Sequence, residues 1–374
     1  MPQDSSTQRI TRLTPLDAVL AMIERGVRPV TAERRPLHAA GNRILAEDVV
    51  APLLPPSAIA LRDGYAVAAA AISDAGPYAP VELVKIPERV DVGEIMPKGA
   101  DAVAPLDAVT LHTNCASAIS VVAPGDGVLA AGGDAAANTP LRRRGERLRP
   151  ADSAIMAAAG IADVVLCAPN IHIARGSPNG STLIDAVLAL LGAAITAAGG
   201  TVLEGPEDGL PLDAALPDGD ADAVIAVGGT GSGRDDEAVR ALTRLGQLEA
   251  HGIAISPGET AAFGFVGTRP VLLVPGRLDA ALAVWLLIGR HLVAKLAGGN
   301  IEDAPHMLPL KRKVTSGIGM TELVPVRRAD DMAEPLASGY LSFTALAHSD
   351  GWIAVPAESE GFAAGTPVAV NPWP

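Results

Sequence analysis

The feature that most constrains the fold is a strand, a glycine-rich loop and a helix start in direct succession at residues 221–237. Residues 223–227 (AVIAV) have the length and the β-branched content of a buried strand. The loop 228–233 (GGTGSG) follows, and a helix is expected from Ala238. Successive backbone N–H groups in such a loop can cradle an anion, because glycine lets the ligand approach closely. The alternative is an ordinary glycine-rich turn, which α/β proteins contain in many places.

The surrounding residues, 169–300, alternate between strands and helices. Strands are expected at 171–174, 201–203, 263–265 and 271–274, and helices at 182–198 and 278–296. This alternation predicts a mostly parallel sheet covered by helices, with ligands at the carboxyl ends of its strands. Two loops lie at such ends, 228–236 and 275–276.

The rest of the chain falls into segments that differ in composition and in the pattern of their apolar residues. Helices are expected at 14–26 and 150–160, and a strand at 162–167. Residues 51–138 carry short apolar runs between glycine, proline and aspartate, which is typical of an inserted β-rich domain. The tail, 301–374, reads as a small β-barrel domain. The predicted domains are therefore 1–50 with 139–168, 51–138, 169–300 and 301–374.

Composition excludes several classes of protein. The net charge of −13 argues against a nucleic-acid-binding surface, which would normally be basic. The polar start of the chain has no apolar core of a secretory signal, and apolar runs are much shorter than a membrane span needs. Two distant cysteines, Cys115 and Cys167, indicate neither a disulfide framework nor a zinc site, which fits a reducing cytoplasm.

Eight segments, in order, resemble the MoeA family of molybdopterin molybdenumtransferases, whose eukaryotic counterpart is the gephyrin E domain. They are 43–52 (RILAEDVVAP), 63–67 (DGYAV), 97–105 (PKGADAVAP), 148–166, 224–242, 251–264, 271–285 and 338–356. The resemblance implies a multidomain α/β fold: a MogA-like molybdopterin-binding domain, an inserted β domain, a C-terminal β-barrel domain and a discontinuous N-terminal domain. It also implies a homodimer.

The chemistry implied by the resemblance is insertion of molybdate into adenylylated molybdopterin, with release of AMP in the presence of magnesium. Asp63 and Asp236 are the implied catalytic carboxylates, and Asp236 the implied metal ligand. Contacts to molybdopterin are implied for Gly228, Gly229, Thr230, Gly231, Ser232, Gly233, Arg234, Asp235, Pro257, Gly258, Pro275, Gly276 and Arg277. A molybdoenzyme or another protein of the cofactor pathway is the implied protein partner.

The chain also departs from the family's motifs. Ser256 and Glu259 replace the two lysines of the family's KPGKP, and Arg277 stands where PGNPVS has its asparagine. The acidic pair of STGDEL is absent from 174–179. Arg175, Arg234 or Arg277 could supply compensating positive charge, or could be plain surface residues. Two functions therefore stay open: an active transferase, or a MoeA-like protein that carries or senses molybdopterin without inserting the metal.

Overall fold

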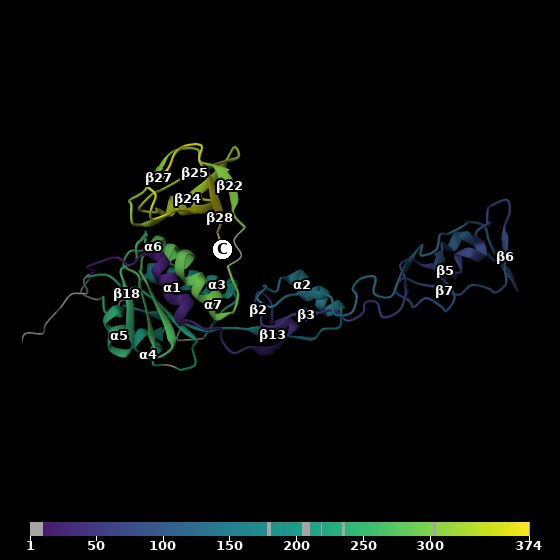
Figure 1. Cartoon of the computed structure of the whole chain (residues 1–374), viewed down its shortest axis with the longest axis horizontal. Helices are drawn as coiled ribbons and strands as arrows, with labels where there is room; N and C mark the ends of the chain where they lie inside the picture. The colour runs from purple at the N-terminus through teal and green to yellow at the C-terminus, as the bar shows by residue number, and fades with distance from the viewer. Residues whose placement is uncertain are drawn as a thin grey trace, which may run out of the picture. The chain divides into compact units, whose positions relative to one another are not determined.

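The computed structural model describes residues 10–177, 181–203, 210–217, 219–233, 236–301 and 304–373. The chain divides into two compact units (Figure 1). Unit 1 comprises Met1–Glu47, Arg144–Pro150 and Asp163–Pro374, and unit 2 comprises Asp48–Arg143 and Ala151–Ala162.

A mixed sheet with the strand order β15-β14-β17-β21-β20-β18 forms the centre of unit 1. Its parallel strands are β15 (Thr201–Val202), β14 (Asn170–Arg175), β17 (Ala223–Val227) and β21 (Arg269–Val274). The short β16 (Leu210–Pro211) also pairs parallel with β14. The other edge is antiparallel and consists of β20 (Ala262–Val266) and β18 (Gln247–His251). The predicted α/β architecture is confirmed, although β18 was not predicted.

Helices cover both faces of this sheet (Figure 1). One face packs against α1 (Leu16–Gly26), α3 (Thr182–Ala197), α6 (Leu278–Val284) and α7 (Arg290–Leu296). The other face packs against α4 (Leu212–Ala215) and α5 (Ala238–Leu245). Ile225 and Val227 of β17 point into the first core, whereas Val224 and Ala226 point into the second. All five residues of β17 are buried, as a strand covered on both faces requires.

The helix predicted over 278–296 contains an irregularity that the sequence pattern did not indicate. A π-helical turn, Trp285–Gly289, joins α6 to α7. Such turns insert one extra residue into an α-helix. Here the turn places the ring of Trp285 against Gly289, where a β-carbon would lie 2.6 Å from Cε3 of the indole.

Two further sheets of unit 1 are separate from the central sheet. β13 (Asp163–Cys167) pairs with β1 (Glu33–Pro36) and β2 (Ile44–Leu45). The C-terminal sheet has the order β19-β24-β26-β28-β22. Its strands are β19 (Ile255–Ser256), β24 (Thr321–Ala329), β26 (Gly351–Val355), β28 (Pro367–Pro372) and β22 (His306–Pro309), with β25 (Met332–Pro335) beside β24 and the helix α8 (Phe343–Ala347). β23 (Val314–Thr315) and β27 (Gly361–Phe362) form a small separate pair.

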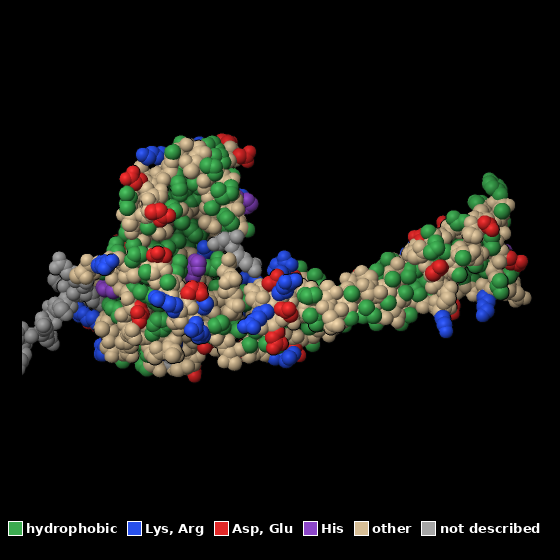
Figure 2. All heavy atoms as spheres, in the orientation of Figure 1, with side chains coloured by type: hydrophobic (Ala, Val, Ile, Leu, Met, Phe, Trp, Pro, Cys, Tyr) green, Lys and Arg blue, Asp and Glu red, His purple; other side chains and the backbone are tan. Residues whose placement is uncertain are grey.

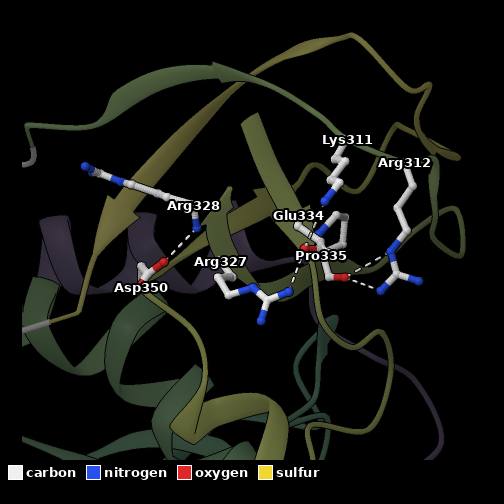
Figure 3. Close-up of polar contacts among 7 residues, drawn as sticks. All are labelled: Lys311, Arg312, Arg327, Arg328, Glu334, Pro335 and Asp350. Atoms are coloured by element: carbon white, nitrogen blue, oxygen red, sulfur yellow. Dashed lines mark hydrogen bonds and ion pairs between the residues drawn. The ribbon is translucent and has the colours of Figure 1, made fainter. Parts of the chain in front are cut away.

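Cationic side chains surround one carboxylate on the surface of the C-terminal sheet (Figure 3). Glu334 of β25 accepts hydrogen bonds from Arg327 at 2.8 Å and from Lys311 at 3.4 Å. The hydrogen bond from Arg327 holds the pKa of Glu334 below its ordinary value. Because this pair is exposed, its contribution to stability is small.

Unit 2 consists of small sheets around a core of short side chains. β5 (Gly64–Val67) lies between β7 (Arg89–Val90) and β8 (Ala102–Ala104), and β10 (Ala116–Ala118) lies between β6 (Val81–Leu83) and β9 (Val109–Leu111). β4 (Ile59–Ala60) pairs with β11 (Val128–Leu129), and β3 (Val49–Val50) with β12 (Pro140–Arg142). The helix α2 (Pro150–Ala158) belongs largely to this unit. Figure 2 shows many apolar side chains on its surface, and Tyr78 and Val84 are fully exposed.

Within the described ranges, no helix has both the length and the apolar character needed to cross a membrane.

The two cysteines are expected to differ in reactivity. Cys167 is buried, its Sγ donates to the carbonyl of Val30 at 3.4 Å, and burial raises the pKa of its thiol. Cys115 is only half-buried. Because the thiolate is the nucleophile, iodoacetamide at pH 8 should modify Cys115 about ten times faster or more. Mass spectrometry of each tryptic peptide measures the rates, with urea-unfolded protein, in which both react alike, as control. Equal rates in the folded protein would contradict this assignment.

Candidate functional site at the carboxyl ends of the parallel strands

Three loops leave the sheet side by side at the carboxyl ends of β14, β17 and β21. The register pairs Arg175 with Val227, and Val227 with Val274, so the three strands end at the same level. The N–H of Gly176 donates to the carbonyl of Val227, and the N–H of Gly228 donates to that of Val274, both at 2.8 Å. The sheet's hydrogen bonds thus continue into the loops and fix their starting points.

The glycine loop approaches its neighbour so closely that side chains are excluded from both. Gly229 has φ +70°, and a β-carbon there would lie 2.1 Å from the carbonyl oxygen of Gly176. A β-carbon on Gly176 would in turn lie 2.1 Å from the carbonyl oxygen of Gly228. Contacts of this length do not occur in folded proteins, so glycine is required at both positions. Gly176 was not among the predicted site residues.

The third loop and the start of α3 complete the junction. Gly276 lies against Gly228, since a β-carbon on Gly276 would be 3.5 Å from Cα of Gly228. The same β-carbon would lie 3.6 Å from Cγ1 of Ile184, in the first turn of α3. The structure therefore brings the predicted residues Gly228, Gly229 and Gly276 together, with Pro275 preceding Gly276.

Asp236 folds back onto the glycine loop. Its Oδ2 accepts the N–H of Gly233 at 2.6 Å, and its own N–H donates to the carbonyl of Gly233 at 3.2 Å. The carboxylate therefore shapes the loop through backbone contacts. Ser232 and Gly233 are exposed beside it, whereas the predicted Arg234 and Asp235 lie outside the described residues.

Thr230 connects the glycine loop to a fourth segment. Its side chain is buried, and its Oγ1 lies 3.0 Å from Oγ1 of Thr260. Its carbonyl oxygen lies 3.1 Å from Nε2 of His251, a residue for which the sequence indicated no role. Because Thr260 follows directly on the segment with Pro257 and Gly258, these contacts bring that segment beside the loop.

Gly258 packs against the start of α6. A β-carbon there would lie 3.3 Å from the carbonyl oxygen of Ala280 and 3.0 Å from Cγ2 of Val284. Pro257 beside it is buried. Glu259, which replaces a family lysine, is exposed, and one of its oxygens accepts the N–H of Gly258 at 3.1 Å. The predicted loops at 228–233, 257–258 and 275–277 thus lie next to one another at this end of the sheet.

Models of known protein families match this chain in three consecutive pieces. Residues 14–160 match the MoeA N-terminal region (domains I and II), residues 179–295 a probable molybdopterin binding domain, and residues 307–373 the MoeA C-terminal region (domain IV). The chain belongs to the MoeA family. The resemblance that the sequence motifs indicated is therefore confirmed.

Two relatives match nearly end to end, and a third matches about three quarters of the chain. The MoeA protein of Pyrococcus horikoshii has a solved structure that superposes with a TM-score of 0.75 at 25% identity, covering 96% of this chain and 99% of that one. A molybdopterin molybdenumtransferase 2 of Mycobacterium tuberculosis is 28% identical, covering 94% of this chain and 97% of its own. The molybdopterin molybdenumtransferase of Haemophilus influenzae is 28% identical over 74% of this chain and 76% of its own. The MoeA fold thus extends over almost the whole chain.

Arg277, where the MoeA motif has asparagine, is held in a defined position. Its Nε and Nη2 donate to the two carboxylate oxygens of Asp279 at 3.1 and 2.7 Å. Its guanidinium carbon lies 4.8 Å from the centroid of the Tyr340 ring, which belongs to the segment preceding α8. Hydrogen bonding to Asp279 raises the pKa of Arg277. Sequence reasoning identified Arg277 but missed Asp279 and Tyr340.

Asp63, the other predicted carboxylate, belongs to unit 2. It is exposed, and its Oδ1 accepts the N–H of Val92 at 2.9 Å. In the described part of the chain, no three histidine, cysteine or acidic side chains gather as they would around a metal ion. A magnesium ion typically takes one or two protein carboxylates and completes its shell with phosphate oxygens and water. Oδ2 of Asp236 already accepts the N–H of Gly233, and the role of Asp236 as a magnesium ligand stays a prediction.

Proposed function

We propose that this MoeA-family chain is a molybdopterin molybdenumtransferase of molybdenum cofactor biosynthesis. The observation that carries the proposal is the junction of Gly176, Gly228, Gly229 and Gly276 at the carboxyl ends of parallel strands. This is where open α/β sheets bind their ligands. The names of the relatives from Mycobacterium tuberculosis and Haemophilus influenzae support the same activity.

In this proposal the substrate is molybdopterin, adenylylated on its phosphate, and the second substrate is molybdate. The two dithiolene sulfurs become ligands of molybdenum, and one oxygen of molybdate leaves as water with the two thiol protons. A second water cleaves the phosphoanhydride bond, so that AMP leaves and molybdopterin keeps its own phosphate. The loop 228–233 lies against the anionic part of the ligand, because its glycines let a ligand approach the backbone closely. Pro257, Gly258, Pro275 and Gly276 form the adjoining walls.

The carboxylates have separate roles in the proposal. Asp236 would hold magnesium together with phosphate oxygens of the ligand, and the ion would offset the charge of the leaving AMP. Asp63, in unit 2, is proposed as a catalytic carboxylate on the family resemblance alone. Arg234 and Asp235 remain proposed contacts to the ligand.

The organisation of the chain is part of the same proposal. We assign residues 1–50 with 139–168 to an N-terminal domain, 51–138 to an inserted β domain, 169–300 to the molybdopterin-binding domain and 301–374 to a β-barrel domain. The resemblance to the MoeA family further supports a cytoplasmic homodimer that delivers its product to a molybdoenzyme or another pathway protein. Sedimentation velocity decides between dimer and monomer.

The alternative function is a carrier or sensor that binds molybdopterin without inserting the metal. Its support is the pair of replacements Lys→Ser at 256 and Lys→Glu at 259 relative to the family motif. A lost charge-assisted contact to a phosphate removes roughly 1.5–3 kcal/mol of binding free energy. The transferase is favoured because two arginines, Arg175 and Arg277, lie at the ends of the strands that flank the glycine loop.

One experiment separates the two functions. Calorimetry with molybdopterin and with its adenylylated form measures binding, and chromatography measures AMP released on addition of molybdate and magnesium. The transferase releases AMP only when molybdate is present, and Asp236→Asn lowers that rate at least tenfold. Tight binding without AMP release would replace the transferase by the carrier. Absence of binding to both pterins would reject both functions.

A further inference from the structure

Two arginines lie at corresponding positions on either side of the glycine loop. Arg175 is the last residue of β14, and Arg277 follows two residues after the Pro275 that succeeds β21. β17 lies between these strands and leads into Gly228. An arginine therefore stands at each strand end adjoining the glycine loop.

Each arginine is oriented by an aspartate in the first turn of the helix that follows it. Nη2 of Arg175 forms a short ion pair with Oδ1 of Asp185 in α3. Arg277 makes its two-pronged contact with Asp279 in α6. Asp279 is buried, with only 4% of its side chain exposed, and its Oδ2 also accepts the N–H of Leu341 at 3.3 Å. The planar guanidinium group of arginine suits such fixed geometry, because its donors form a rigid fork.

Both pairs lie over the same end of the same sheet face. α3 and α6 contribute to one hydrophobic core on that face. Ile184, adjacent to Asp185, lies within reach of both glycine turns, since β-carbons on Gly228 and Gly276 would be 3.5 and 3.6 Å from its side chain. The starts of the two helices therefore meet above Gly228.

Arg175 retains donors that its surroundings do not satisfy. Its Nε and Nη1 are buried and have no hydrogen-bond partner among the described residues, and 15% of the side chain is exposed. Buried donors of a charged group are rarely left unpaired, because removing them from water is costly. Arg277, 58% exposed, keeps Nη1 outside its pair with Asp279.

We propose that Arg175 and Arg277 form a two-arginine clamp that holds a tetrahedral oxyanion at the strand ends beside the glycine loop, with Asp185 and Asp279 as positioning residues. This inference deepens the proposed function and rests on it. The clamp takes over the cationic role of the lysines that Ser256 and Glu259 replace. Because the aspartates offset the arginine charges, binding depends on the directed donors of the guanidinium groups more than on net charge.

The oxyanion has two possible sources: the phosphate of molybdopterin, and molybdate itself. Three probes distinguish them by calorimetry on the full chain: inorganic phosphate, sodium molybdate alone, and molybdopterin without molybdate. If the clamp holds the pterin phosphate, changing the arginines weakens the binding of inorganic phosphate and of molybdopterin. If the clamp holds molybdate, the same changes weaken the binding of sodium molybdate.

The decisive variants are Arg175→Gln and Arg277→Gln. Each is expected to raise the Kd of the bound oxyanion about tenfold or more, which corresponds to one charge-assisted hydrogen bond. Asp279→Asn should produce a smaller loss in the same probe, because it releases Arg277 without removing it. Arg175→Lys keeps the charge in the half-buried position and tests the fork geometry where Arg175→Gln does not fold.

Arg327→Gln is the matched control. Arg327 is 49% exposed and ion-paired to Glu334, like Arg277 to Asp279, but it lies on β24 of the C-terminal sheet (Figure 3). The Arg327→Gln protein should bind every probe as the unchanged protein does. Unchanged affinity in the Arg175 and Arg277 variants, or no binding of any probe by the unchanged protein, would overturn the clamp. Oxyanion binding through both arginines without molybdopterin binding would preserve the clamp and reject the proposed function.

Discussion

Substitution of Gly229 by alanine is expected to destabilise unit 1 by about 2–5 kcal/mol and to abolish ligand binding at the strand-end site. A left-handed backbone costs a residue with a side chain about 1–2 kcal/mol. The new β-carbon would also lie 2.1 Å from the carbonyl oxygen of Gly176 and 3.0 Å from Cβ of Ala238. Separating the two loops adds about 1–3 kcal/mol, because the packed strand ends resist displacement.

Gly267→Ala separates these two contributions. Gly267, in the turn between β20 and β21, has φ +62°, but a β-carbon added there would meet no atom within 4 Å. It should therefore lose only the backbone share, about 1–2 kcal/mol. Calorimetry measures the melting temperature of both variants, and that of Gly229→Ala should lie on the order of 10 °C below that of the unchanged protein. Equal shifts would show that the close approach of the two loops is not needed for stability.

The elements around this junction could be predicted because their patterns are local. The apolar run at 223–227 is continuous, as expected of a strand buried on both faces, and β17 has these bounds. α3 follows the predicted apolar spacing, and its Ser181 accepts the N–H of Ile184 as a helix cap. The loop between β17 and α5 follows from its glycines.

The contacts that make a site could not be predicted, since each joins residues far apart in the sequence. Gly176 is an ordinary glycine until the fold places it under Gly229. Thr230 reaches Thr260 through a hydrogen bond between side-chain hydroxyl groups, which no spacing indicates. Asp279 reads as an acidic residue in the first turn of a helix, a frequent and usually exposed position. Its burial and its contact with Leu341 depend on how the segment before α8 packs.

The replacements in the motifs gain a physical explanation from these contacts. At Asp279 and Arg277 the chain has a buried acid and a cation where the MoeA motif has neither. A buried carboxylate without a partner would be strongly destabilising, so the two replacements depend on each other. Arg175 and Asp185 form a second such pair at the end of β14, which β17 separates from β21. Two coupled pairs are consistent with a site that kept its ligand while its cations moved to other loops.

Replacing Trp285 by alanine is expected to destabilise unit 1 by about 3–5 kcal/mol, the cost of removing a large buried ring. Trp285 is among the largest fully buried side chains and lies in the core between the sheet and α1, α6 and α7. The π-helical turn places its ring on Gly289. Alanine would leave a cavity that the helix cannot close, because the start of α6 is fixed by the contacts of Asp279 with Arg277 and Leu341.

Trp373→Ala provides the comparison for this loss. Trp373 packs against the edge of the same core but is only partly buried, and its Nε1 donates to Oγ of Ser349 at 3.0 Å. Its removal should cost clearly less, about 1–2 kcal/mol, by the area it withdraws from water. Thermal unfolding of both variants, followed by circular dichroism, measures the difference. If Trp285→Ala loses no more unfolding free energy than Trp373→Ala, the helix repacks around the π turn. In that case α6 does not depend on the Trp285 ring to hold Arg277 and Asp279 beside the glycine loop.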